Sequence, residues 1–395
     1  MKPTIFITLL LSSAAWLSAA ASETSNLSEQ IDSIFSTLDS EKAPGCSVGV
    51  IKDGEFLHKA GYGMANLELD VPLDADSVFR MASVSKQFTA MAVLLLADDG
   101  LIDLDDDIRL YLPDLADHET EVSIRSILGH VSGIPDYESA LVTGGDIEQG
   151  ARDYGLRSSA GGPFRMGNED YLSISEFYDA VKVMTLSHAP MTKFDYSNTN
   201  YFLLSMLVEN VTGQTLREYA KERIFEPLGM DNTLYHDNVG DIIKNRATGY
   251  KAKEGDGFAT DMTNLYFVGD GGVHTSINDF IKWDRNFYKP KLGKNPTELM
   301  KLMNTPNSQL MDDGTHYADS GRSAMLYGNG QNIYQEDGHE IYSHSGGWLG
   351  FSNYYIRYQD LSLSVVVLCN DYDQWPGKLS REVIQLFLPA SSATN

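Results

Sequence analysis

The sequence has few cysteines, no block of basic residues and, after its first segment, no long hydrophobic run. Two cysteines in 395 residues, Cys46 and Cys369, are too few for a disulfide framework or for a zinc site built on thiolates. Thirty Lys and Arg residues against 55 Asp and Glu give a formal net charge of −25, which disfavours binding to nucleic acid or to an anionic membrane surface. The composition, 42% hydrophobic and 22% charged, is that of a globular protein with a sizeable core.

The first 21 residues have the three parts of a secretory signal peptide. Lys2 supplies a positive charge, residues 5–17 form an apolar run, and alanines at 19–21 fit a cleavage site. A membrane anchor is the alternative, but the run is short against the roughly 20 residues of a spanning helix, and no cysteine follows for a lipid anchor. We expect residues 1–21 to be removed and residues 22–395 to form one domain in the periplasm or outside the cell. Export would permit a disulfide bond.

Strand patterns lie at both ends of the chain, with helix patterns between them. The strand patterns cover residues 44–53, 55–63, 340–347, 351–360 and 361–371. Asp53-Gly54 joins the first two as a hairpin signal. Residues of about 86–275 are mostly helical in pattern, apart from a Gly-, Ser- and Asp-rich surface insertion at 139–170. We predict an α+β fold, with one antiparallel sheet built from both chain ends, flanked by helices and interrupted by the helical region.

A serine and a lysine share one helix face where the first strands give way to the helical region. Ser83 and Lys86 stand three residues apart, ahead of an apolar helix pattern that runs to residue 99, and Gly100 is its stop. A serine hydroxyl becomes nucleophilic when a base takes its proton, and a desolvated lysine can lose its charge and act as that base. The alternative is that Ser83 caps the helix and Lys86 extends to water. This motif alone leaves both readings open.

Two further short motifs follow. YSN at residues 196–198 precedes an apolar helix pattern, and HSGG at residues 344–347 lies on a predicted strand, where glycine marks close approach of a ligand or a bend. In this order the three motifs resemble the S-x-x-K, Y-x-N and K/H-T/S-G motifs of the serine β-lactamase and penicillin-binding-protein superfamily. The flanking segments, among them PGCSVGVIKDG, SILGHVSGIPDY and GDGGVHTSINDFIKW, resemble one branch of it over residues of about 30–385. That branch holds class C β-lactamases, D-alanyl-D-alanine carboxypeptidases, D-aminopeptidases and esterases.

The resemblance implies catalytic roles for three residues, in a β-lactamase/transpeptidase-like fold. Ser83 would be the acylated nucleophile, and Lys86 would help to deprotonate it. Tyr196 would move the proton between Ser83, the leaving group and the deacylating water.

The resemblance also implies a set of substrate-binding residues. Asn198 would orient Lys86 and bind a substrate amide. His344, followed by Ser345 and Gly346, would contact Tyr196 and the substrate carboxylate. The N–H groups of Ser83 and Gly347 would form the oxyanion hole. The β-lactamases of this branch have lysine where this chain has His344, and a neutral imidazole is a poorer partner for a carboxylate, so this position favours a peptidase or an esterase.

The resemblance makes the strands that hold Cys46 and Cys369 antiparallel neighbours, with both cysteines at the same end. A bridge requires Cα atoms about 4.4–6.8 Å apart. Between a bridge and two buried free thiols, we expect the free thiols.

These observations predict a secreted serine hydrolase that acts through an acyl-enzyme, with neither a metal nor an organic cofactor. The expected activity is that of a D-alanyl-D-alanine carboxypeptidase-like peptidase on D-amino-acid peptides. An esterase or a D-aminopeptidase of the same family is the alternative, followed by a true β-lactamase, and a non-catalytic penicillin sensor is the alternative from another class. The expected partner is a small peptide, an ester or a cell-wall-derived substrate, with no nucleic acid and no stable membrane span after signal cleavage.

Two other hydrolase classes fit the sequence less well. A zinc protease would need H-E-x-x-H, whereas the histidines of HEIYSH, residues 339–344, stand five apart. An α/β-hydrolase would need G-x-S-x-G, and in GHVSG, residues 129–133, the serine comes one place late.

Overall fold

The central sheet begins with the hairpin that the sequence predicts. In the computed structural model, β1 (Cys46–Lys52) and β2 (Glu55–Tyr62) are joined by Asp53 and Gly54, whose φ angles are 54° and 80°. Two consecutive residues with positive φ form the turn that matches the twist of paired strands, and Asp-Gly is a sequence that adopts it. The structure describes residues 26–138, 173–238, 240–263, 266, 268–310 and 323–388.

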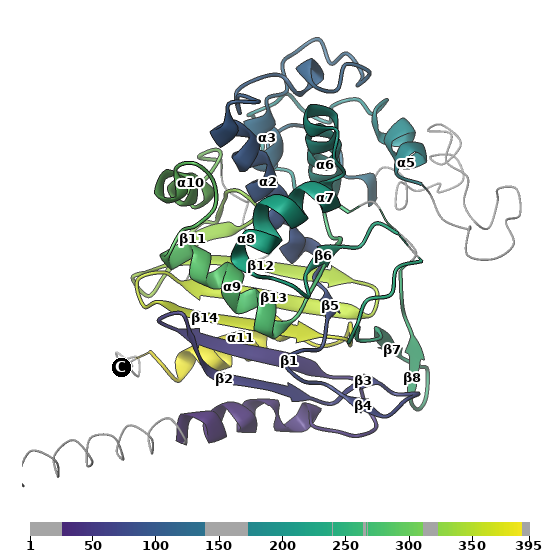
Figure 1. Cartoon of the computed structure of the whole chain (residues 1–395), viewed down its shortest axis with the longest axis vertical. Helices are drawn as coiled ribbons and strands as arrows, with labels where there is room; N and C mark the ends of the chain where they lie inside the picture. The colour runs from purple at the N-terminus through teal and green to yellow at the C-terminus, as the bar shows by residue number, and fades with distance from the viewer. Residues whose placement is uncertain are drawn as a thin grey trace, which may run out of the picture.

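The two ends of the chain meet in one seven-stranded antiparallel sheet (Figure 1). Its order is β10-β11-β12-β13-β14-β1-β2, so β1 lies beside the last strand of the chain. The C-terminal strands are β10 (Leu326–Tyr327), β11 (Asn332–Glu336), β12 (His339–Trp348), β13 (Phe351–Tyr358) and β14 (Leu363–Cys369). The predicted strands are confirmed, and β10 and β11 extend the sheet beyond them.

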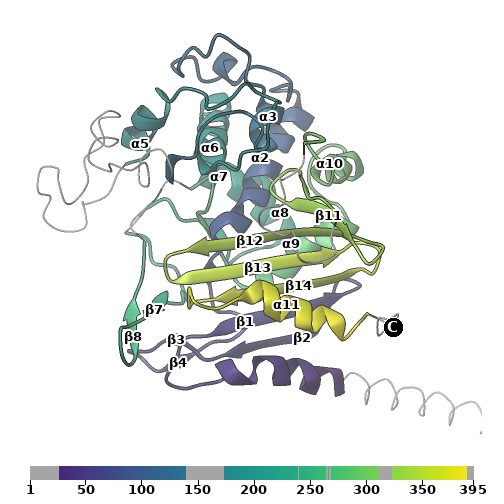
Figure 2. The same cartoon turned by 180° about the vertical axis from the view of Figure 1, so that it is seen from behind.

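Both faces of the sheet are covered. Successive side chains of a strand point to opposite faces, so Val365 and Val367 of β14 pack in one core and Val366 in another. α11 (Pro376–Gln385) lies over one face, as Figure 2 shows, and α9 (Ile277–Tyr288) lies over the other (Figure 1). Burial on both faces explains the uninterrupted apolar run of β14.

The helix that carries Lys86 crosses the larger core. α2 (Lys86–Asp99) has the predicted bounds, and Gly100, with φ 76°, ends it. Its side chains are buried from Lys86 to Leu96. A helix that is buried on all sides positions its first turn rigidly, and that turn bears the candidate site.

Among its described residues, the region between the sheet halves holds less helix than the sequence predicts. Its described α-helices are α3 (Ile124–Leu128), α5 (Ile174–Val181), α6 (Asn198–Thr212), α7 (Leu216–Ala220) and α8 (Glu226–Leu228), the π-helical turn η5 (Lys221–Phe225) joins α7 to α8, and α10 (Pro296–Met303) follows α9. Short strands pair outside the main sheet, as β5 (Phe79–Arg80), β9 (Val273–Thr275) and β6 (Leu234–Tyr235), as β3 (Met64–Asn66) with β4 (Val71–Pro72), and as β7 (Tyr250–Ala252) with β8 (Phe258–Thr260). Two- and three-residue strands are too short to give a recognisable pattern.

Cys46 and Cys369 form a disulfide bond, which corrects the expectation of free thiols. The two residues face each other in the β1–β14 register, and their Cα atoms are 4.0 Å apart, just below the range set above. The N–H of Asn370 donates to the carbonyl of Gly45, which marks the cysteines as a non-hydrogen-bonded pair, the closer of the two kinds of antiparallel pair. The bond links β1 and β14, the strands of the sheet that come first and last along the chain.

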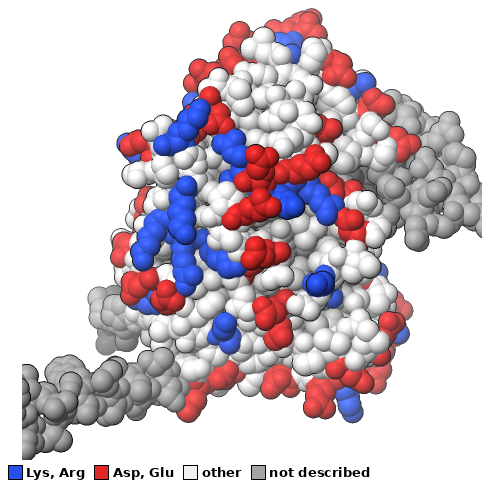
Figure 3. Space-filling model, viewed as in Figure 1, with Lys and Arg blue, Asp and Glu red and all other residues white. Residues whose placement is uncertain are grey.

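Charged side chains are unevenly distributed on the face of the molecule that Figure 3 shows. Figure 3 shows Lys and Arg side chains gathered on one part of this face, next to acidic ones. Ion pairs such as Arg223–Asp99 and Lys282–Asp279 link basic side chains to acidic ones. Among the described helices, none is long and apolar enough to cross a membrane. The predicted signal peptide, residues 1–21, and the predicted insertion, residues 139–170, lie outside the described residues.

Candidate active site

Ser83 lies on a strained turn between β5 and α2. It belongs to the short 3₁₀ helix η2 (Ala82–Ser85), and Ala82, the residue before it, has φ 47°. A residue other than glycine with positive φ is costly and is commonly retained at functional sites. The turn leaves Ser83 partly exposed, while Ala82 and Val84 on either side of it are buried.

Gly346 of the HSGG motif allows β12 to approach this turn. A Cβ atom at Gly346 would lie 2.3 Å from the carbonyl oxygen of Met81 and 3.2 Å from the nitrogen of Ser83. Only a residue without a side chain fits there, so the glycine is explained by close approach of the backbone of Met81 and Ser83, and not by the ligand or the bend that the sequence suggested. Gly347, the next residue, lines the same pocket as Ser83. Ser345 is exposed on the same strand.

Lys86 is fully buried and makes three hydrogen bonds. Its Nζ donates to Ser83 Oγ at 3.0 Å, to Asn198 Oδ1 at 2.7 Å and to the carbonyl oxygen of Asp270 at 2.9 Å. The amide and carbonyl oxygens can only accept. The contact with Ser83 is therefore the one across which a proton can move in either direction.

Asn198 is held by acidic residues on its other side. Its Nδ2 donates to Asp136 Oδ2 at 3.3 Å and to Glu138 Oε1 at 3.2 Å. The predicted contact with Lys86 is present, whereas a substrate amide would have to compete for the Asn198 side chain. Neither Asp136 nor Glu138 was a predicted site residue, although Asp136 falls in the quoted segment SILGHVSGIPDY.

Acidic side chains also line the pocket beside Ser83. Glu138 and Asp270 are both part of its wall, and the Tyr137 hydroxyl donates to Asp270 Oδ2 at 2.8 Å. Burial raises the pKa of Glu138, and the negative charges of Asp136 and Asp270 raise it further. A cation bound in this pocket would relieve that repulsion.

Tyr196 packs beside the Ser83–Lys86 pair. Its ring centroid is 5.0 Å from Lys86 Nζ and 6.2 Å from the ring of His344. Within the described residues its hydroxyl makes no hydrogen bond. The position agrees with the predicted role, and that role stays a prediction.

His344 is buried and neutral, and its partner is a residue that the sequence did not indicate. Nδ1 lies 2.5 Å from the carbonyl oxygen of Ser345, which only accepts, so Nδ1 carries the proton. Nε2 therefore accepts from the Tyr327 hydroxyl at 2.8 Å. Burial and, next, the positive charge of Lys86 lower the pKa of His344 to about 3. Tyr327 thus occupies the imidazole nitrogen that we expected to face Tyr196 and a substrate carboxylate.

These residues of the predicted motifs meet in one place, which is what an S-x-x-K serine hydrolase requires. A sequence model of the family described as Beta-lactamase matches residues 31–387. The chain belongs to the Beta-lactamase family. Among the described residues of this family member, no group of three or more His, Cys, Asp or Glu side chains is placed to hold a metal ion.

The relatives of this Beta-lactamase family chain include peptidases. It is 28% identical to the D-aminopeptidase of Gluconobacter oxydans (strain 621H) over 328 residues, which are 83% of this chain and 56% of that protein. The chain therefore spans little more than half the length of that relative. The family match agrees with the serine hydrolase predicted from the three motifs.

Solved structures share its fold. The octameric penicillin-binding protein homologue from Pyrococcus abyssi superposes with a TM-score of 0.73 at 24% identity, over 92% of this chain and 77% of that one. The D-amino acid amidase from Ochrobactrum anthropi SV3, complexed with D-phenylalanine, superposes with a TM-score of 0.68 at 21% identity, over 92% of this chain and 99% of that one. At these identities the likeness shows the β-lactamase/transpeptidase-like α+β fold.

Proposed function

We propose that this serine hydrolase cleaves the amide bond of D-amino-acid amides and short peptides that carry a free α-amino group. The observation that carries the proposal is the pair of carboxylates, Glu138 and Asp270, in the wall of the pocket that contains Ser83. A substrate ammonium is the cation that such a pocket favours. The D configuration rests on the likeness to the D-aminopeptidase of Gluconobacter oxydans.

The reaction would run through an acyl-enzyme on Ser83. Ser83 Oγ attacks the amide carbon while Lys86 takes the hydroxyl proton, and the N–H groups of Ser83 and Gly347 stabilise the oxyanion. The leaving amine receives a proton by way of Tyr196. Water then attacks the ester, gives a proton back through the same groups and releases the amino acid.

The carboxypeptidase predicted from the sequence needs a cation that faces the substrate's carboxylate, and each basic group near Ser83 is a poor candidate. His344 is neutral, and the three hydrogen bonds of Lys86 all go to protein oxygens. Arg80 belongs to the pocket wall, but its Nε and Nη1 are buried from solvent. Recognition of the amino end is therefore the better-supported proposal.

Export is a separate proposal. Residues 1–21 have a signal-peptide pattern, and the Cys46–Cys369 bond is of a kind that persists in oxidising compartments. N-terminal sequencing of the protein purified from its native cells would find a chain that starts near residue 22. A mature chain that starts at Met1 would contradict export by this route.

A panel of chromogenic substrates tests the proposed specificity. We expect D-alanine p-nitroanilide to be cleaved, and its N-acetyl form to have a kcat/KM lower by about tenfold or more, because a lost partner of a partly desolvated charge pair costs at least that much. The L form keeps the ammonium, and its slower cleavage is expected from the likeness to the D-aminopeptidase. Glu138→Gln should lower kcat/KM for the free amine and spare a neutral aryl ester. Glu68→Gln, at an exposed acidic residue outside the pocket, is the matched control. Equal rates on the free and the acetylated substrate would overturn amino-end recognition.

A further inference from the structure

His130 is a buried histidine that lies against Tyr196 and has no role in the reaction described above. It follows Gly129, the C-cap of α3, is fully buried, and has φ 55°. Its ring centroid is 4.2 Å from that of Tyr196 and 4.6 Å from that of Tyr327. A left-handed conformation at a residue other than glycine is retained where the surroundings demand it.

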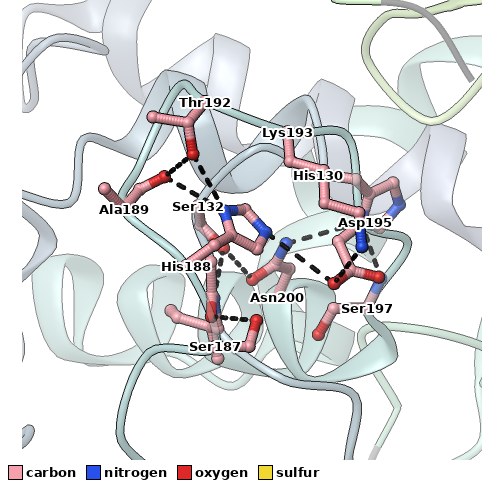
Figure 4. A network of polar contacts seen from close by, with 12 residues as sticks. His130, Ser132, Ser187, His188, Ala189, Thr192, Lys193, Asp195, Ser197 and Asn200 are labelled. Atoms are coloured by element: carbon pink, nitrogen blue, oxygen red, sulfur yellow. Dashed lines mark hydrogen bonds and ion pairs between the residues drawn. The ribbon is translucent and has the colours of Figure 1, made fainter.

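His130 binds the backbone on both sides of Tyr196. Its carbonyl oxygen accepts from the N–H of Asp195 at 2.8 Å, and its Nδ1 accepts from the N–H of Ser197 at 3.2 Å. Figure 4 shows the His130 ring, Asp195, Ser197 and Asn200 in this arrangement. The two hydrogen bonds and the ring contact together fix residues 195–197, and with them the direction of the Tyr196 side chain.

The contact with Ser197 requires a neutral imidazole with its proton on Nε2. A backbone N–H can only donate, so Nδ1 must offer its lone pair. Burial and, after it, the positive charge of Lys86 hold the pKa of His130 well below its usual value. Nε2 is buried and has no hydrogen-bond partner among the described residues, so the ring is retained for its contacts at Nδ1 and on its faces.

We propose that His130 is a positioning residue for Tyr196. Its Nδ1 and carbonyl oxygen hold the backbone of residues 195–197, and its ring packs against the phenol, so that the hydroxyl is held near the Ser83–Lys86 pair. The inference rests on the proposed role of Tyr196 in proton transfer. It predicts that changes at His130 act on the reaction through Tyr196 and spare substrate binding.

Two substrates separate this role from a merely structural one. An anilide leaving group must be protonated as it departs, whereas a p-nitrophenolate leaves without a proton. If His130 acts through Tyr196, a variant at 130 lowers kcat/KM for D-alanine p-nitroanilide more than for D-alanine p-nitrophenyl ester. Damage to the whole pocket would lower both equally.

Two variants carry the test. His130→Phe keeps a ring and removes the acceptor, and we expect its anilide kcat/KM to fall about 10–100-fold, within the range of lost general acid catalysis, with an ester loss at least about threefold smaller. His130→Asn keeps a side-chain acceptor and tolerates positive φ, so it should lose less than His130→Phe and still show an anilide-selective loss. If one of the two variants does not fold, the other still tests the role of His130.

A Tyr196→Phe background distinguishes failure of this inference from failure of the proposed function. Tyr196→Phe should itself show a large anilide-selective loss, and adding His130→Phe should then change the anilide rate by less than about threefold, because residues that act as a unit are not additive. Undiminished anilide cleavage by Tyr196→Phe would refute the role of Tyr196. With Tyr196→Phe impaired as expected, equal losses on both substrates or full additivity would overturn the role of His130.

Discussion

Lys86 Nζ lies 3.0 Å from Ser83 Oγ, and its two other hydrogen bonds go to oxygens that can only accept. Asn198 and the Asp270 carbonyl therefore fix the direction of the Lys86 amine. The third position on Nζ, which can hold a proton or a lone pair, faces the Ser83 hydroxyl. This geometry suits proton transfer between Ser83 and Lys86 without a histidine base. It also makes the exchange of lysine for arginine a sharp test.

Lys86→Arg keeps the positive charge and removes the group that can accept a proton. We expect kcat/KM to fall by about three orders of magnitude or more, because the members of a catalytic unit are not replaceable one by one. Arg125→Lys, at an exposed ion pair with Asp105, is a matched control for the exchange of the two basic residues. A Lys86→Arg enzyme within tenfold of wild type would contradict the role of Lys86 as base.

The pH profile distinguishes recognition of the two substrate ends. Because the pKa of His344 is lowered to about 3, His344 stays neutral from about pH 5.5 to 8.5 and offers no charge to a carboxylate. The kcat/KM profiles of a D-alanyl peptide and of its C-terminal amide should therefore run parallel over this range. A loss with rising pH that is confined to the free acid would show that a titrating cation binds the carboxylate after all.

The free-amine substrate should show a pH dependence of its own. Burial raises the pKa of Glu138, so its carboxylate forms at a higher pH than usual, and ammonium binding strengthens as pH rises through that pKa. Binding then weakens as the substrate amine loses its proton, near pH 8 for an α-amino group. Glu138→Gln should remove the acidic limb of kcat/KM relative to a neutral aryl ester. If the acidic limb is unchanged in Glu138→Gln, the group that titrates there is not Glu138.

The Cys46–Cys369 bond predicts a chemical and a thermodynamic result. Alkylation in denaturant without reductant should modify no cysteine, and alkylation after reduction should modify both. The Cys46→Ser/Cys369→Ser double variant should lose about 2–5 kcal/mol of unfolding free energy in urea titrations, as is typical when a native bridge is removed. Alkylation of both cysteines without reductant would contradict the disulfide bond and show the free thiols that we expected from the sequence.

The sequence predicts those parts of the fold that repeat a local pattern. Asp53-Gly54, the alternation in β1 and β2 and the apolar helix after Lys86 each act over a few residues, and each is confirmed. The two residues of β10 are too few for such a pattern, and the sequence gives no register for β1 against β14, so the pairing of Cys46 with Cys369 could not be read from it.

The same distinction between local patterns and long-range contacts applies to the candidate active site. Ser83 and Lys86 share a helix turn, so their contact follows from spacing alone. The Tyr327 hydroxyl reaches His344 across the β10–β11–β12 edge, and Glu138 and Asp270 come to the pocket from segments that are far apart in the sequence. Contacts between segments that are distant in sequence depend on the packing of the whole molecule. For this reason the sequence predicts the catalytic serine and lysine better than the groups that select the substrate.

Covalent labelling at Ser83 tests the central claim most directly. A fluorophosphonate should add one mass equivalent to the intact enzyme, and digestion should place it on the peptide that contains Ser83. Ser83→Ala should remain folded, as judged by circular dichroism, take up no label and lose substrate turnover by several orders of magnitude. Label on another residue, or a Ser83→Ala enzyme that keeps more than a few per cent of wild-type activity, would contradict the account.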